Sequence, residues 1–108
     1  MNSLLTAFIT EDIVFAALES VIDPELGLNI VDLGLIYSVD IKEAGRITIT
    51  MTLTTPGCPL HASFVQEIER VLWQSIPDLT GVSVELVWDP PWNPMMISPE
   101  GRALLGIE

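Results

Sequence analysis

The feature that most constrains the fold is an eight-residue run in which apolar residues and threonines alternate without interruption. Side chains in a β-strand point alternately to opposite faces, so this run predicts a strand with one apolar and one polar face. A similar run precedes it at residues 35–41, and residues 42–45 supply the turn between the two. We therefore predict a β-hairpin that is buried on one face only. The second strand has an apolar face of Ile47, Ile49, Met51 and Leu53 and a polar face of Thr48, Thr50, Thr52 and Thr54.

A helix is predicted before the hairpin. Thr10 precedes two acids, which is typical of a helix N-cap with acidic residues in the first turn. Apolar residues then recur at the spacing of one helix face: Val14, Ala17, Leu18 and Val21. Pro24 disfavours helical geometry in the residue before it, so the helix should stop by Asp23.

Two further helices and a third strand are predicted after the hairpin. Pro59 suits the first position of a helix, whose buried face would contain Phe64, Val65, Ile68, Val71 and Leu72. Pro77 should end that helix. A third strand would then contain Val82, Val84, Leu86 and Trp88. Three prolines exclude regular structure from residues 88–96, and Ser98 to Gly106 indicate a last short helix.

The predicted order of elements is therefore α-β-β-α-β-α. Each strand has only one apolar face, so helices should cover only one side of the sheet. The predicted class is α+β, a two-layer sandwich of about three strands with helices on one face. We find no internal repeat or linker, and we expect residues 1–108 to form a single domain.

Composition excludes several classes of function. The chain has 15 acidic and 4 basic residues, a formal net charge of −11. Such a surface repels phosphate backbones and anionic lipids, so we expect neither nucleic acid nor a membrane as a partner. The chain begins without a basic region or a cleavage site of the kind that signal peptides carry. The single cysteine excludes an internal disulfide, and a reducing cytoplasmic location fits it best.

Cys58 is the sharpest candidate for chemistry. With Pro59 as the first helical residue, Cys58 falls at the N-cap, where free backbone N–H groups and the helix dipole favour a thiolate. A thiolate can ligate a metal or attack an electrophile. The alternative is a small, inert, buried cysteine in a turn.

His61 lies three residues after Cys58, on the same face and in the same first turn of the predicted helix. The two side chains could share a metal ion, or the imidazole could form an ion pair with the thiolate. The alternative is a capping role at the start of the helix.

Acids and threonines earlier in the chain are further candidates for the site around Cys58. Asp23, Glu25 and Asp32 occupy the loop that leaves the first helix, where acids are usually solvated or form Asx-turns. The glycines and apolar residues around them instead indicate a loop packed against the protein, in which an acid needs a partner. Thr54 and Thr55 end the second strand beside Cys58, although β-propensity alone would explain them.

A cluster of aromatic and methionine residues follows the third strand. Trp88, Trp92, Met95 and Met96 could close the end of the core, or they could form a surface that binds a partner.

Three blocks of the sequence together resemble the metal–sulfur (iron–sulfur) cluster assembly factor family, the SufT/PaaD-like group. They are VIDPELGLNIVDLGLIY at 21–37, MTLTTPGCPL at 51–60 and VELVWDPPWNPMMISPEGR at 84–102. The resemblance extends from Thr10 to Gly106 and implies an α+β domain. It also implies an auxiliary factor or carrier in the maturation of iron–sulfur proteins, not a turnover enzyme. Its expected partners are the assembly machinery and client apoproteins.

The resemblance also assigns residues to the site. The family's motif cysteine matches Cys58, and its threonine pair matches Thr54 and Thr55. Its DPE and DLG motifs match residues 23–25 and 32–34, so the resemblance implies that Asp23, Glu25 and Asp32 line the site. His61 occurs only in some members' motifs. The chain ends without the cysteine-bearing extension of the PaaD subgroup, which favours the general assembly branch.

A cluster bound by this chain would need ligands from elsewhere. An iron–sulfur cluster normally has four protein ligands, and one chain offers Cys58 and at most His61. We therefore expect a transient cluster that bridges two chains of a homodimer, or that borrows ligands from a client or a small thiol.

Two other functions remain as alternatives. One is a thiol enzyme with Cys58 as nucleophile and His61 as base. The other is an adaptor without a metal, which binds partners through its acidic surface and through Trp88, Trp92 and Met95.

Overall fold

The computed structural model describes residues 9–24, 26–54 and 61–106, and side chains from Ser63 onward in the third of these ranges. The order of the helices and strands confirms the predicted order, with two added 3₁₀ turns. The elements are α2 (Glu11–Leu18), β1 (Ile36–Lys42), η1 (Glu43–Gly45), β2 (Arg46–Met51), α3 (His61–Ser75), β3 (Gly81–Leu86), η2 (Pro94–Met96) and α4 (Pro99–Leu105).

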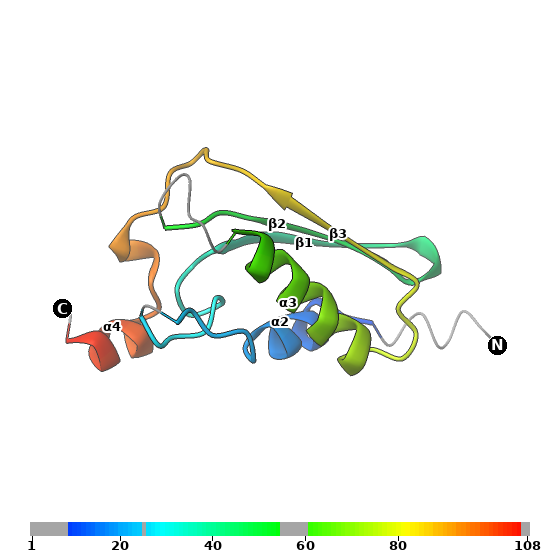
Figure 1. The fold of residues 1–108 in the computed structure, drawn as a ribbon, viewed down its shortest axis with the longest axis horizontal. Helices are drawn as coiled ribbons and strands as arrows, with labels where there is room; N and C mark the ends of the chain where they lie inside the picture. The colour runs from blue at the N-terminus through cyan, green and yellow to red at the C-terminus, as the bar shows by residue number, and fades with distance from the viewer. Residues whose placement is uncertain (1–8, 25, 55–60, 107–108) are drawn as a thin grey trace.

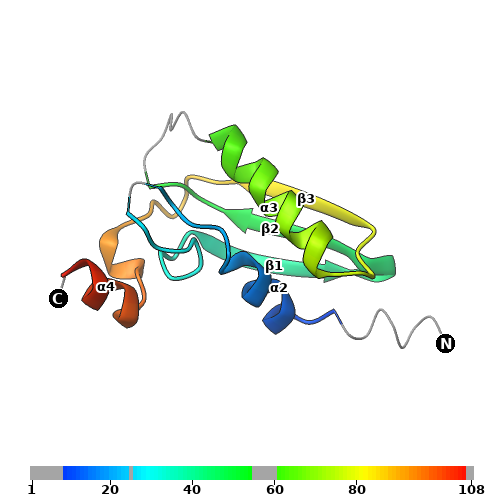
Figure 2. The ribbon, with the colours of Figure 1, turned by 60° about the horizontal axis from the view of Figure 1, so that its bottom comes forward.

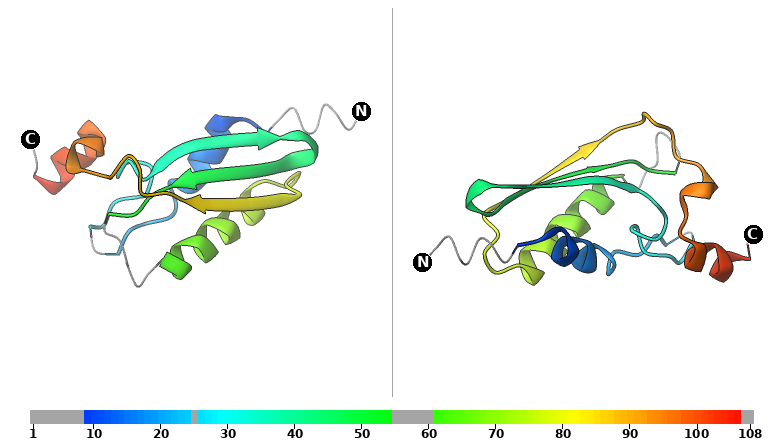
Figure 3. Two further views of the ribbon diagram at one scale, coloured as in Figure 1. Left: turned by 90° about the horizontal axis from the view of Figure 1, so that it is seen from above. Right: turned by 180° about the vertical axis from the view of Figure 1, so that it is seen from behind.

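The three strands form one sheet in the order β1-β2-β3. β1 and β2 pair antiparallel as the predicted hairpin, with Val39 opposite Ile49. β3 runs parallel to β2, and α3 makes the connection between them. Both α2 and α3 lie on the same side of the sheet (Figures 1 and 2). Among the described residues the opposite side carries no helix (Figure 3). These observations confirm the two-layer α+β class.

The core lies between the sheet and the two helices. From the sheet side it takes the predicted apolar face of β2, and from the helix side most of the two predicted stripes, with Val21 just after the end of α2. Val65, also predicted on the buried face of α3, is only half-buried and lies outside this core. Ile49, Leu18, Ile68 and Leu72 are each 0% exposed. Burial of side chains of this size stabilises the fold by about 1.5–3 kcal/mol each, so this interface dominates its stability.

Local signals at the helix ends behave as the sequence predicts. The Thr10 side chain accepts a hydrogen bond from the Ile13 backbone N–H at 3.3 Å, and the Ser98 side chain accepts one from Gly101 at 3.0 Å. Gly106 ends α4 in a left-handed conformation with φ of 77°. α4 itself lies beyond the end of the sheet rather than over its face (Figure 1).

Four further predictions about the elements need correction. Thr52, expected on the polar face, is 0% exposed. It lies beyond the last residue of β2, where its N–H bonds to Leu35 and the neighbouring Met51 carbonyl bonds to Val87. Trp88 lies outside β3, because the last register pair of that strand is Met51 with Leu86.

The other two corrections are smaller. Val82, Val84 and Leu86 are half-buried, because β3 is an edge strand. Residues 94–96, expected to be irregular, form the single 3₁₀ turn η2, in which Asn93 caps the Met95 N–H at 2.8 Å. The predicted start of the second helix at Pro59 lies outside the described residues.

Candidate functional site

The loop between α2 and β1 carries the first acidic motif, and Asp23 closes a tight turn in it. Asp23 is 5% exposed, and its carboxylate Oδ1 accepts a hydrogen bond from the Leu26 N–H at 3.1 Å. Its backbone carbonyl accepts from the Gly27 N–H at 2.8 Å, and its own N–H donates to Leu28 at 2.8 Å. Gly27 has a φ of 74° there, which the turn requires. This acid therefore has a role in shaping the loop.

The second acidic motif forms a separate turn further along the same loop. Asp32 Oδ2 accepts a hydrogen bond from Asn29 Nδ2 at 2.9 Å, and the Asp32 N–H donates to Asn29 Oδ1 at 2.8 Å. The Asp32 carbonyl also accepts from the Ser98 N–H at 2.7 Å, just before α4. The structure thus places Asp32 against the C-terminal segment.

The aromatic and methionine cluster divides into packed and exposed members. Trp92 is half-buried against the core, as the packing interpretation expects, whereas Trp88 is 42% and Met95 is 70% exposed. Tyr37 donates a hydrogen bond to the Pro90 carbonyl at 2.7 Å and contacts the Met96 sulfur at 3.7 Å. Trp88 and Met95 are thus the members of the cluster that a partner could reach.

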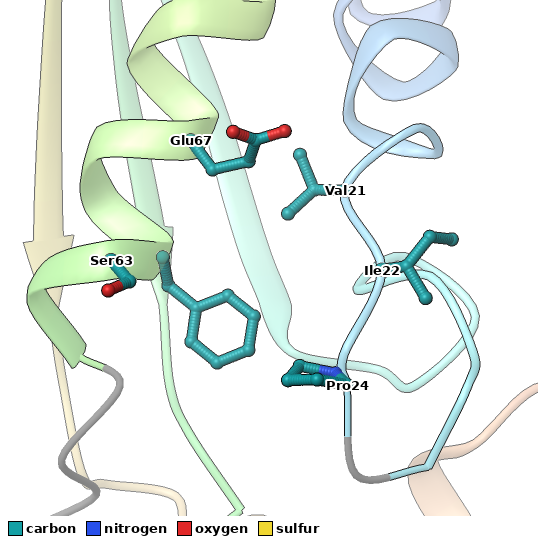
Figure 4. Close-up of a pocket in the computed structure, with 6 residues that line it drawn as sticks. Val21, Ile22, Pro24, Ser63 and Glu67 are labelled. Atoms are coloured by element: carbon teal, nitrogen blue, oxygen red, sulfur yellow. The ribbon is translucent and has the colours of Figure 1, made fainter.

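A cavity of about 200 Å³ separates the first loop from the first turns of α3. Its lining comes from both segments: Val21, Ile22, Pro24, Ser63, Phe64 and Glu67. In Figure 4 the side chains of Val21 and Glu67 point toward one another across the gap. The cavity therefore brings the stretch around Asp23 to the start of α3, three residues after Cys58 in the sequence. Sequence reasoning took Val21 and Phe64 only as core residues and missed this cavity.

Glu67 forms an ion pair on the surface of α3. Arg70 Nε donates to Glu67 Oε1 at 3.0 Å, a second guanidinium nitrogen contacts Oε2, and Nη1 donates to Gln74 at 3.0 Å. The hydrogen bond from Arg70, and then its charge, lower the pKa of the Glu67 carboxyl, and the same contacts raise the pKa of Arg70. The carboxylate at the cavity is thus ionised at neutral pH.

Several of the predicted site residues lie outside the described residues: Cys58, Glu25 and Thr55, together with the side chain of His61. Thr54 is half-buried at the end of the segment that follows β2. Within the described residues, no three His, Cys, Asp or Glu side chains come together in a way that could hold a metal ion.

Thr52 is a further residue of interest that the sequence reasoning placed only on a strand face. Its hydroxyl is buried and has no hydrogen-bond partner in the part of the chain that the structure describes. The uninterrupted alternation of Ile47–Thr54 hid this position, because nothing in the pattern distinguishes Thr52 from Thr48 or Thr50.

Comparison with known proteins identifies the class. The model of the iron–sulfur cluster assembly protein family matches residues 11–86, from α2 to the end of β3. The chain belongs to this family, as the three sequence blocks predict. No helix in the described ranges is long and apolar enough to cross a membrane.

Individual relatives agree with the family assignment. The chain is 45% identical over 95 residues to the Fe-S protein maturation auxiliary factor YitW of Bacillus subtilis, which covers 88% of this chain and 92% of that protein. It is 42% identical over 87 residues to the Fe-S protein maturation auxiliary factor SufT of Staphylococcus aureus, covering 81% of this chain and 98% of that one. A match to an iron-sulfur cluster carrier protein of Synechocystis covers only 23% of that longer protein, at 35% identity.

Solved structures share the fold. A domain of unknown function from Bacillus anthracis has a TM-score of 0.86 at 42% identity, and the match covers 91% of this chain and 92% of that one. A conserved hypothetical protein from Thermotoga maritima has a TM-score of 0.78 at 41% identity, with coverage of 92% and 96%. The α+β sandwich is thus common to this family.

Proposed function

We propose that this chain is an auxiliary factor in the assembly of iron–sulfur clusters or in their transfer to client proteins. The observation that carries the proposal is its similarity, over nearly its full length, to factors named for Fe-S protein maturation. The cluster is its cargo, and Cys58 is the protein ligand that holds it. We further propose that residues 1–108 act as one domain, in the cytoplasm.

The shortage of ligands supports a shared cluster. A cluster normally has four protein ligands, and the described residues supply no group of three candidate ligands. Two copies related by a two-fold axis would offer two Cys58 thiolates and two His61 imidazoles. A bridging cluster of this kind would be held weakly enough to be passed on, which suits a carrier.

The remaining site residues have supporting roles in this proposal. Asp23 and Asp32 shape the loop through the turns described above, and Glu25, Thr54 and Thr55 line the cluster site beside Cys58. The exposed side chains of Trp88 and Met95 contact the assembly machinery or clients. Trp92 holds this surface in place, because its ring packs on the core.

Activity of iron–sulfur enzymes in cells tests the proposal. In cells that lack this chain, we expect wild type to restore such an enzyme and Cys58→Ser to fail, with both variants present at equal abundance. Full restoration by Cys58→Ser would overturn the role of Cys58 and favour an adaptor. Under the adaptor function, Met95→Ser would lose the activity instead, because Met95 would contact the partner. The variant suits this test because Met95 is exposed and its replacement does not disturb the core.

A non-enzymatic role has its own test. A thiol enzyme with Cys58 as nucleophile would accumulate a covalent intermediate on that sulfur. Intact-mass measurement during turnover with candidate substrates should show no such adduct on a factor that only carries clusters.

A further inference from the structure

The cavity between the first loop and α3 has an apolar floor and a charged edge. Val21 and Phe64, 1% and 6% exposed, form the floor, whereas Ile22 is 50% exposed at the rim. The cavity lies open to solvent next to residues that pack into the core. Concave, mostly apolar openings with a few polar groups at the edge are the usual form of a binding site.

The dimensions of the cavity define the group that would fill it. An apolar cavity of about 150 Å³ lined by Leu, Ile and Phe accommodates one benzene ring. The cavity here is about 200 Å³, and four of the six lining residues within the described ranges are apolar. One aromatic or branched aliphatic side chain therefore fits, and a whole helix or cofactor does not.

The charge at the edge restricts the partner further. The Glu67 carboxylate points across the cavity toward Val21 (Figure 4), and the hydrogen bond and charge of Arg70 lower its pKa. Arg70 contacts both oxygens of that carboxylate, and the whole chain carries a net charge of −11. A partner segment with a cation beside its apolar side chain would be attracted, and an acidic segment would be repelled.

We propose that this cavity binds one aromatic or branched apolar side chain of a partner protein, adjacent to a lysine or arginine of that partner. The proposal rests on the proposed function in one respect only, the expectation that the partner belongs to iron–sulfur protein maturation. The binding step itself requires no cluster and no Cys58.

Short peptides test the binding directly on the cluster-free protein. Amide spectra of the labelled protein would be recorded with acetyl-Phe-Arg-amide, acetyl-Phe-Glu-amide and acetyl-Ala-Arg-amide at millimolar concentration. We expect the Phe-Arg peptide to shift amides of residues 21–24 and 63–67, and the Ala-Arg peptide to leave them unchanged. The Phe-Glu peptide should bind about 2- to 5-fold more weakly, the range for a solvent-exposed charge pair.

Variants separate the apolar and charged contributions. Ile22→Ser should weaken the Phe-Arg peptide several-fold, and Glu67→Gln should abolish the preference for Arg over Glu while keeping the need for Phe. Trp73→Ser is the matched control, because Trp73 is 49% exposed on the same helix but does not line the cavity. The proposal would be overturned if the Phe-Arg peptide did not bind, or if it bound no better than the Ala-Arg peptide. It would also be overturned if Ile22→Ser left binding of the Phe-Arg peptide unchanged.

The outcomes also separate this proposal from the wider function. If the cavity serves maturation, Ile22→Ser should lower iron–sulfur enzyme activity in cells while the purified variant still takes up iron and sulfide. If Ile22→Ser loses peptide binding and still restores normal enzyme activity in cells, the cavity is not a docking site for the maturation partner. That result would leave the proposed cluster function intact.

Discussion

The indole Nε1 of Trp92 donates a hydrogen bond to the backbone carbonyl oxygen of Leu33 at 2.7 Å. These residues lie 59 positions apart, one after β3 and the other in the loop before β1. A buried carbonyl without a partner is costly, so this bond fixes the C-terminal segment against the loop. The second acidic motif and the proline-rich segment are therefore one structural unit.

Gly34 provides a sensitive test of how closely the C-terminal segment approaches this loop. A Cβ at Gly34, which has a φ of 78°, would collide with the backbone carbonyl of Met96. Gly27 has a similar φ of 74°, but its Cβ would meet nothing within 4 Å. We expect Gly27→Ala to lower the free energy of unfolding by about 1–2 kcal/mol, and Gly34→Ala by about 1–3 kcal/mol more. Urea denaturation measures both, and equal losses would refute a close approach at Gly34.

Thr52 carries an unsatisfied buried hydroxyl, so its replacement should stabilise the protein. Thr52→Val keeps the shape and removes a polar group that has no partner among the described residues. We expect the free energy of unfolding to rise by about 1–3 kcal/mol. Thr48→Val, at a half-exposed position of β2, should change it by less than about 0.5 kcal/mol. A loss of stability in Thr52→Val would mean that the hydroxyl is bonded in solution.

The sequence predicted the elements whose signals are local. The alternation from Ile47 to Met51, the cap at Thr10 and the end of the last helix at Gly106 each depend on a few neighbouring residues, and each prediction was confirmed. The burial of Thr52 depends instead on the backbone at Leu35 and Val87, which come from distant parts of the chain. No local pattern indicates such a contact.

The candidate site was predictable only in part for the same reason. The turn chemistry around Asp23 is readable from Pro24 and Gly27. The contact between Asp32 and the segment before α4 is not, because it crosses 66 positions (98 − 32). The cavity likewise forms between two segments that each have the pattern of a core face. The functional role of Cys58 was predicted mainly from family resemblance and not from periodicity.

The ion pair on α3 predicts a pH dependence. Because Arg70 lowers the pKa of Glu67 in the folded state, the pair stabilises the fold above the ordinary glutamate pKa of about 4.5. This contribution is lost as the pH falls through the lowered folded-state value. Carbon-detected NMR titration should show the Glu67 pKa rising toward the ordinary value in Arg70→Gln. An unchanged Glu67 pKa in Arg70→Gln would contradict the account.

The methionines should differ in their rates of oxidation. Met95 is 70% exposed, Met96 is half-buried with its sulfur 3.7 Å from the Tyr37 hydroxyl, and Met51 is 1% exposed. Among these three methionines, dilute hydrogen peroxide should therefore form the sulfoxide at Met95 first and at Met51 last. Peptide mass spectrometry after alkylation of Cys58 follows each site, and unfolding in urea should equalise the rates. Early oxidation of Met51 in the folded protein would contradict its burial.

The most direct test of the account is anaerobic reconstitution with iron and sulfide, which compares wild type with Cys58→Ser. Visible absorbance, iron and sulfide per chain, and oligomeric state would be measured on one sample. We predict about half a cluster per chain on a dimer, with loss of both the cluster and its absorbance in Cys58→Ser. A full cluster on a strict monomer without added thiol would contradict the bridged site. Equal loading of wild type and Cys58→Ser would contradict the central claim that Cys58 holds the cluster.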